Sequence, residues 1–216
     1  LTLGADRVAD YQGDMRYRGS IVGPVADRIT GAKAMIAGQR HTFEANEGAN
    51  CLHSGAAGIH LKLWEIAGAT DTACTLRLTL ADGEGGFPGT RQVEARFSLQ
   101  NNSLQLDIAV TSDAETLWNA TNHSYWNLDG SRDWTGHSLQ IKADHWLPTD
   151  AETLPTGEIS PCAGSAMDFA TLRQITPGAP PLDHNFCLSD APQPLRDVLI
   201  LQGQSSVTLT VATTEP

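Results

Sequence analysis

The stretch that decides the fold is VEARFSLQNNSLQLDIAV, residues 93–110. Apolar side chains occupy every second position on both sides of a polar break at Gln100 to Ser103; they are Val93, Ala95, Phe97, Leu99, Leu104, Leu106, Ile108 and Val110. A period of two places such side chains on one face of a β-strand. The stretch therefore predicts a β-hairpin with its turn at Gln100 to Ser103.

Alternation of the same kind continues along much of the chain. A second hairpin is predicted from Ala32 to Ile36 and Arg40 to Glu44, around Ala37-Gly38-Gln39. Further strands are predicted at residues 61–66, 74–80, 137–143 and 205–211. No segment keeps a helical period for three turns, so the prediction is an all-β fold, an antiparallel β-sandwich or barrel.

Length and composition favour one domain with a hydrophobic core of its own. A chain of 216 residues is long enough to bury about 70% of its unfolded surface. The four cysteines, Cys51, Cys74, Cys162 and Cys187, lie far apart and show no zinc-site spacing. We expect buried free thiols, which suit a reducing compartment, and a cytoplasmic location.

The charge balance argues against two classes of partner. The formal net charge is -11 at pH 7, so a nucleic-acid backbone or an anionic membrane surface would be repelled. No apolar stretch approaches the roughly 20 residues of a membrane-spanning helix. We therefore expect neither nucleic acid nor membrane as a partner, and the sequence leaves the oligomeric state open.

The densest cluster of hydrogen-bonding and aromatic groups is Asn122-His123-Ser124-Tyr125-Trp126-Asn127, at the end of a strand predicted from Leu117. Aromatic rings suit the C–H faces of a sugar, amides and hydroxyls suit its hydroxyl groups, and an imidazole exchanges protons near neutral pH. A turn whose His and Asn side chains satisfy nearby backbone groups is the alternative interpretation.

Three other segments carry candidate residues. His53 lies in a Gly-flanked loop, residues 46–55, where a surface histidine is equally compatible with the pattern. Arg28 follows Asp27, and the pair could be an ordinary surface ion pair. Asp183 lies in Leu182-Asp-His-Asn-Phe186, which a plain junction between loop and strand would also explain.

Several chemistries lack their motifs in this sequence. The Gly-rich segment Asp82 to Gly89 has neither the spacing of an EF-hand nor the lysine of a P-loop, so we interpret it as a turn-forming loop. No G-x-S-x-G elbow supports a serine hydrolase. Paired carboxylates, as in glycosidases, stay open because any two acids can meet in space.

Taken together, these segments resemble the aldose 1-epimerase (galactose mutarotase) family in order and spacing. The similar stretches, which run nearly end to end, are Asp10-Tyr11, residues 23–29, 46–55, 82–89, 122–128, 147–159 and 182–186, and Thr213-Thr-Glu-Pro216. The resemblance implies a galactose mutarotase-like supersandwich over residues 1–216, with the sugar in a cleft. It also leads us to expect that the domain is incomplete at both ends.

The resemblance also implies roles for individual residues. His123 would be the catalytic acid that protonates the ring oxygen, with His53 beside it as the second catalytic histidine. Arg28 and Asp183 would bind hydroxyls and Tyr125 would line the pocket. Asp27 is expected to bind substrate as well, although it stands where the family has Asn. Ser54 stands where the family has Gly, so both positions depart from the pattern.

The activity implied is interconversion of the α and β anomers of a free aldohexose, with no cofactor and no metal. A carboxylate takes the proton from the C1 hydroxyl while the imidazolium protonates the ring oxygen, and the ring opens and recloses. The family's general-base Glu lies beyond the Thr-Thr-Glu-Pro segment, so Glu215 is not that base. Two alternatives stay open: a non-catalytic carbohydrate-binding module and a mutarotase-like enzyme for hexose phosphates.

Overall fold

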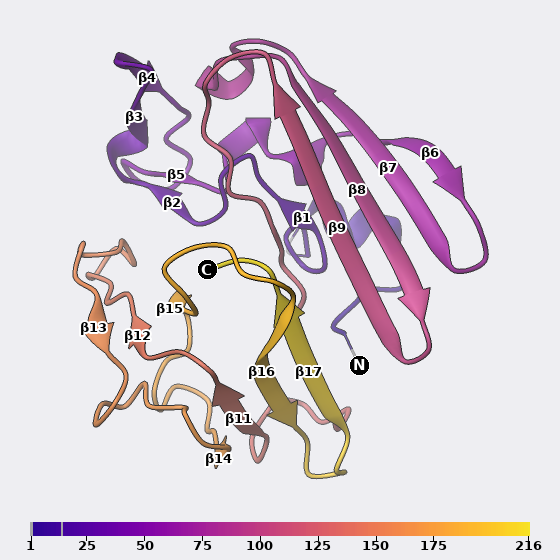
Figure 1. The fold of residues 1–216 in the computed structure, drawn as a ribbon, viewed down its shortest axis with the longest axis vertical. Coiled ribbons are helices and arrows are strands. Elements are labelled where there is room, and N and C mark those ends of the chain that lie inside the picture. The colour runs from indigo at the N-terminus through magenta and orange to yellow at the C-terminus, as the bar shows by residue number, and fades with distance from the viewer. Residues whose placement is uncertain (1, 14) are drawn as a thin grey trace. The chain divides into compact units, whose positions relative to one another are not determined.

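A computed structural model describes residues 2–13 and 15–216. The chain folds into two compact units, residues 4–123 and residues 1–3 with 124–216. Strands dominate both units (Figure 1), and the helices of the described residues are 3-10 helices of three to five residues. None of these helices is long and apolar enough to cross a membrane. The predicted all-β class is confirmed.

A four-stranded antiparallel sheet is the main element of the unit at residues 4–123 (Figure 1). Its order is β6-β7-β8-β9, with β6 at Glu65–Ala69, β7 at Ala73–Leu80, β8 at Arg91–Gln100 and β9 at Ser103–Ser112. Val93 pairs with Val110 and Phe97 with Leu106, so the predicted hairpin and its register are confirmed. The turn is Asn101-Asn102, and Asn101 has a φ of 53°, which Asn tolerates better than most residues.

Three short strand pairs complete this unit. The second predicted hairpin is confirmed as β3 (Lys33–Ile36) and β4 (Gln39–Thr42), joined by Ala37 and Gly38 with φ values of 48° and 75°. The other pairs are β2 (Arg28–Ile29) with β5 (Cys51–Leu52), and β1 (Ile21–Val22) with β10 (Thr121–Asn122). The 3-10 helices are η1 (Val8–Gln12), η2 (Thr30–Ala32), η3 (Gly55–Ala57), η4 (Ile59–Leu61) and η5 (Glu84–Gly86).

Two apolar clusters hold the unit together. One lies under the large sheet, where alternate side chains of β7 and β8 meet β1 and η4; its buried members are Ile21, Ile59, Leu80, Val93 and Ala95. The other joins the β3–β4 hairpin to the 82–89 loop; its buried members are Ala32, Ile36, Phe43, Cys51 and Phe87. Burial of such side chains stabilises the fold by roughly 1.5–3 kcal/mol for each large one.

The loop at residues 82–89 is a turn-forming loop, as predicted, and a buried charge ties it to the sheet. The Arg91 side chain is fully buried and donates from Nη1 to the Phe87 carbonyl (2.8 Å) and from Nη2 to the Ala81 carbonyl (2.9 Å). Burial lowers the pKa of Arg91, against the opposing effect of nearby acids, first Glu84. Buried charges persist only when hydrogen-bonded, so Arg91 fixes both ends of this loop.

The other unit contains two sheets. One has the order β14-β11-β16-β17, with β11 at Ser138–Ile141, β14 at Arg173–Gln174, β16 at Arg196–Gln202 and β17 at Thr208–Thr213. The second has the order β13-β12-β15, with β12 at His145–Trp146, β13 at Ser160–Pro161 and β15 at Phe186–Cys187. Its buried core is Leu139, Ile141, Ala143, Met167, Phe169 and Ile175.

Three predicted strands are wrong in their bounds. The strand predicted at 61–66 begins only at Glu65, because residues 59–61 form η4 around the buried Ile59. The strand predicted at 205–211 begins at Thr208, because residues 203–206 form a turn. The strand predicted from Leu117 is reduced to a bridge at Asn119 and the two residues of β10. Tertiary contacts override local alternation at each place.

All four cysteines are free thiols, and the expected burial holds for two of them. Cys51 and Cys162 are buried, and Cys74 and Cys187 are partly buried. Burial is the first cause that raises the pKa of the Cys51 and Cys162 thiols. Such thiols behave as small apolar side chains in a core.

Candidate active site

His53 and His123 come together although 70 positions separate them in the sequence. Their ring centroids lie 5.2 Å apart, with the rings almost perpendicular. The Tyr17 ring lies 4.8 Å from His53 and 6.2 Å from His123, measured between centroids. A third imidazole, His60, lies 5.0 Å from the same Tyr17 ring. We call these four residues the histidine cluster.

His123 is fixed by the backbone on both sides of its peptide. Its N–H donates to the Ser20 carbonyl (2.8 Å), and its carbonyl accepts from the Gly19 N–H (3.0 Å). These bonds extend the β1–β10 pairing, in which Ile21 lies opposite Asn122. The pairing therefore brings the Tyr17–Ser20 segment and His123 to one place.

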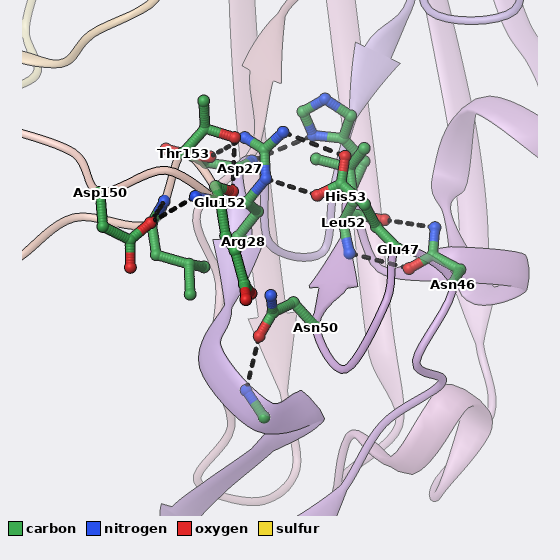
Figure 2. A network of polar contacts seen from close by, with 12 residues as sticks. Asp27, Arg28, Asn46, Glu47, Asn50, Leu52, His53, Asp150, Glu152 and Thr153 are labelled. Carbon is green, nitrogen blue, oxygen red and sulfur yellow. Dashed lines mark hydrogen bonds and ion pairs between the residues drawn. The ribbon is translucent and has the colours of Figure 1, made fainter.

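His53 lies in a tight loop whose backbone sets the state of the ring. The Asp27 N–H donates to His53 Nδ1 (3.0 Å), and the His53 N–H donates to the Asp27 carbonyl (2.9 Å). Because a backbone N–H can only donate, Nδ1 must be the bare nitrogen, and the proton of the neutral ring is on Nε2. His53 therefore presents an N–H donor from its other side (Figure 2).

The same loop stores backbone strain. His53, Ser54 and Gly55 have consecutive φ values of 50°, 65° and 56°. The hydroxyl of Ser54 both accepts from the Val25 N–H (2.9 Å) and donates to the Val25 carbonyl (3.1 Å), which ties the loop to the segment before Asp27. Left-handed residues in series persist only where the surroundings hold them, and they gather at functional sites.

Arg28 forms the ion pair with Asp27 that the alternative interpretation expected, but its side chain is largely buried and also pairs with Glu47. Its side chain is only 15% exposed and makes two hydrogen bonds to Glu47, from Nε to Oε2 (2.5 Å) and from Nη2 to Oε1 (3.0 Å). Nη1 also donates to Asp27 Oδ1 (3.2 Å). The Glu47 hydrogen bonds are the first cause that raises the pKa of Arg28. A two-point pair of this kind holds the guanidinium in one orientation (Figure 2).

The pKa values of two histidines are lowered, and burial is the first cause. The pKa of His53 is lowered to about 4, next by the charge of His123, with Asp27 acting in the opposite direction. The pKa of His60 is also lowered to about 4, next by Arg16 and then by His123. Both rings are therefore neutral at pH 7.

These shifts predict how stability depends on pH. Since the unfolded pKa of histidine is near 6.5 and the folded value is about 4, the unfolded state binds more protons between these values. The contribution of these histidines to the free energy of unfolding should be complete above about pH 6.5 and should fall as the pH drops toward 4. Both rings are partly exposed, so water screens the effect to about 1 kcal/mol for each ring.

Urea unfolding at several pH values between 7.5 and 4 measures this dependence. The matched comparison is the double variant His53→Gln, His60→Gln, which keeps every carboxylate. We expect the loss of stability between pH 7 and pH 5 to be smaller in the variant than in the unsubstituted protein. Equal losses in the two proteins would contradict the assignment of the titration to these rings.

Two predicted site residues belong to the other unit. Tyr125 follows His123 by two positions, is 44% exposed, and its carbonyl accepts from the Leu3 N–H (2.8 Å). Asp183 is exposed, beside His184, whose ring packs edge-on against Trp146 at 5.0 Å. The structure thus brings together His53, His123, Asp27 and Arg28 within one unit, and places Tyr125 and Asp183 in the second.

Two hollows in the surface differ in the residues that line them. A hollow of about 690 Å³ lies beside β11, β12 and the 188–193 loop, and none of the predicted site residues lines it. A smaller one of about 550 Å³ is lined by Gly13, Arg16, Tyr17 and Arg18, next to the histidine cluster. We place the site at the cluster because proton-transfer groups and strained backbone converge there. Among the described residues, no three His, Cys, Asp or Glu side chains are arranged to hold a metal ion.

Sequence reasoning missed Tyr17, His60 and Glu47. Glu47 lies in the same loop as His53, so its closeness to Arg28 follows from the pairing of β2 with β5. No local pattern signals Tyr17 or His60, because their role depends on contacts between segments more than 35 positions apart.

Comparisons with known proteins identify the family of this chain. The family model described as aldose 1-epimerase matches residues 1–216. The galactose mutarotase of Mus musculus is 31% identical over 223 residues, which cover 100% of this chain and 65% of that protein. The aldose 1-epimerase of Escherichia coli is 32% identical over 175 residues, 80% of this chain and 51% of that protein. The names of these relatives favour neither of the two alternative functions.

Solved structures give the same result. The crystal structure of an aldose epimerase homologue from C. elegans has a TM-score of 0.88 and 26% identity, and covers 97% of this chain and 66% of that one. A galactose 1-epimerase from Lactobacillus acidophilus has a TM-score of 0.79 at 26% identity, covering 94% of this chain and 63% of that one. The chain spans 65% of the Mus musculus protein, 66% of the C. elegans protein and 51% of the Escherichia coli protein. This chain belongs to the aldose 1-epimerase family.

Proposed function

We propose that this protein is an aldose 1-epimerase, which interconverts the α and β anomers of a free aldohexose by opening and reclosing the sugar ring. The observation that carries the proposal is the contact between the His53 and His123 rings, whose centroids lie 5.2 Å apart. His53 offers an N–H donor there, and Glu47 holds the nearby Arg28 in place. Family membership and the names of the relatives support the same reaction.

In the proposed mechanism His123 is the general acid. The group that protonates the ring oxygen must carry a proton near neutral pH. Burial lowers the pKa values of His53 and His60 to about 4, so these two rings do not carry that proton. His53 instead donates a hydrogen bond from Nε2, because the Asp27 N–H occupies its Nδ1. During opening of the sugar ring, negative charge develops on the ring oxygen. A hydrogen-bond donor that is already in place stabilises this charge without having to reorganise.

We propose that the other predicted residues bind the sugar. Arg28, held by Glu47, presents its guanidinium edge to hydroxyl oxygens, and the Asp27 carboxylate accepts from a hydroxyl. Asp183 is proposed to accept from another hydroxyl, and Tyr125 to lie against a C–H face. The proposed reaction also needs a carboxylate that takes the proton of the C1 hydroxyl, and the family resemblance assigns this role to a glutamate other than Glu215.

Four free thiols support a reducing compartment, so we propose a cytoplasmic location. The net charge of -11 supports a small neutral sugar as the partner, in preference to nucleic acid or a membrane surface. That the two compact units form one mutarotase-like β-sandwich domain over residues 1–216 stays a prediction.

Polarimetry tests the function directly. Freshly dissolved α-D-galactose and α-D-glucose are followed to equilibrium with and without the protein expressed from its complete gene. We expect the rotation to reach its equilibrium value faster with protein, and to reach the same final value, since a catalyst leaves the anomer ratio unchanged. Sugar binding without acceleration would instead favour a carbohydrate-binding module.

A further inference from the structure

His60 is held in place by its backbone neighbours. It is the middle residue of η4, and the residue before it, Ile59, is completely buried. The Ile59 N–H donates to the Gly23 carbonyl (2.9 Å), and the Ile59 carbonyl accepts from Trp64 Nε1 (2.9 Å). Gly23 directly follows β1, the strand that also positions His123, so η4 and His123 share one frame.

The ring of His60 packs directly against the Cα of Gly58, in the space that a Cβ would occupy. A Cβ added to Gly58 would overlap His60 Cε1 and lie 2.6 Å from Nδ1. The φ and ψ of Gly58 are -54° and 129°, which any residue adopts, so the backbone alone does not require glycine here. Glycine at this position is therefore explained by the close approach of the imidazole.

His60 contacts the candidate active site through the Tyr17 side chain. Its Nδ1 is buried and has no hydrogen-bond partner among the described residues, while its ring packs against Tyr17. The same Tyr17 ring contacts His53 and His123, and the Arg16 guanidinium lies 4.9 Å from the Tyr17 centroid. A shift of His60 would be transmitted to both other imidazoles through Tyr17.

We propose that His60 is a positioning residue of the candidate active site, whose ring packs against Gly58 and holds Tyr17 against His53 and His123. The proposal rests on the proposed function, which it deepens. The titratable groups facing His60 are Arg16 and His123, and both disfavour a positive charge on its ring. The positioning role of His60 therefore depends on the shape of its ring and does not require that the ring be protonated.

Three substitutions and one control test the proposal in the protein from its complete gene. Gly58→Ala displaces the ring, His60→Ala removes it, and His60→Phe keeps a neutral ring in the same place. Gly68→Ala is the control, because a Cβ at Gly68 meets nothing within 4 Å and its φ is not left-handed. Steady-state mutarotation gives kcat and KM, and NMR titration follows the imidazole resonances of His53 and His123.

We expect kcat to fall about tenfold in Gly58→Ala and His60→Ala, with KM within about twofold, because misplaced catalytic groups slow the chemical step. His60→Phe should keep kcat within about threefold, and Gly68→Ala should match the unsubstituted protein. A kcat unchanged in Gly58→Ala, or a loss in His60→Phe as large as in His60→Ala, would overturn the positioning role.

The NMR titration separates this proposal from the proposed function. If the unsubstituted protein does not accelerate mutarotation, the proposed function fails, and the resonances still decide the role of His60. We expect Gly58→Ala and His60→Ala to shift the titration midpoints or ring resonances of both His53 and His123, and His60→Phe to shift them less. Resonances that match the unsubstituted protein in all three variants would refute the proposal.

Discussion

Replacement of His123 by alanine is expected to lower kcat for mutarotation by at least about a hundredfold. Loss of a general acid costs between 10² and 10⁴ in rate, and about 100-fold corresponds to roughly 2.7 kcal/mol of transition-state stabilisation. The two neighbouring imidazoles cannot take over the task, because burial lowers their pKa values to about 4. Polarimetry with α-D-galactose measures the effect in the protein from its complete gene.

Binding should survive this substitution. The acid is proposed to act on the ring oxygen as the bond breaks, whereas Arg28 and Asp27 are proposed to bind hydroxyls in both the ground state and the transition state. We therefore expect the dissociation constant for galactose to stay within a few-fold of the unsubstituted value in calorimetry. Loss of kcat and binding together would indicate a disrupted site.

A second histidine provides the control. His145 lies in β12, in the other unit, and is exposed. His145→Ala changes the same residue type and should leave kcat within about twofold. Near-normal kcat in His123→Ala would exclude His123 as the general acid, whatever the control shows.

Substitution of Gly86 by alanine is expected to destabilise the fold by about 3 kcal/mol. Gly86 has a φ of 89°, and a Cβ there would overlap the Thr42 carbonyl oxygen and lie 3.3 Å from Phe43 Cδ1. The Gly86 carbonyl also accepts from His41 Nδ1 at 3.1 Å, so the loop cannot move away without losing that bond. Left-handed strain contributes about 1 kcal/mol and overpacking against fixed backbone about 2 kcal/mol more.

Gly83→Ala is the matched control in the same loop. Gly83 has a φ of 75°, but a Cβ there meets nothing within 4 Å. Only the left-handed strain applies, so we expect a loss of about 1 kcal/mol. Urea unfolding of both variants gives the two free energies, and equal losses would show that the contact with Thr42 has no energetic consequence.

Much of the fold follows from the sequence because it depends on local alternation. The β8–β9 hairpin is determined by residues 93–110, in which every second side chain is apolar, so a one-residue slip would turn the apolar face to water. The β3–β4 hairpin follows from Ala37-Gly38. Alternation failed at residues 61–66, where burial of Ile59 against β1 and β8 forms η4 in place of a strand.

The sequence by itself also determined the family and most of the proposed site residues, since they lie in continuous motifs such as Asn122–Asn127. Only the tertiary structure decided what these residues can do. The tautomer of His53 is set by the backbone of Asp27, and the clamp on Arg28 comes from Glu47. The positions of Tyr17 and His60 result from strand pairing and from a bare Cα at Gly58, because hydrogen bonds and close packing act between atoms that are near in space, whatever their separation along the chain.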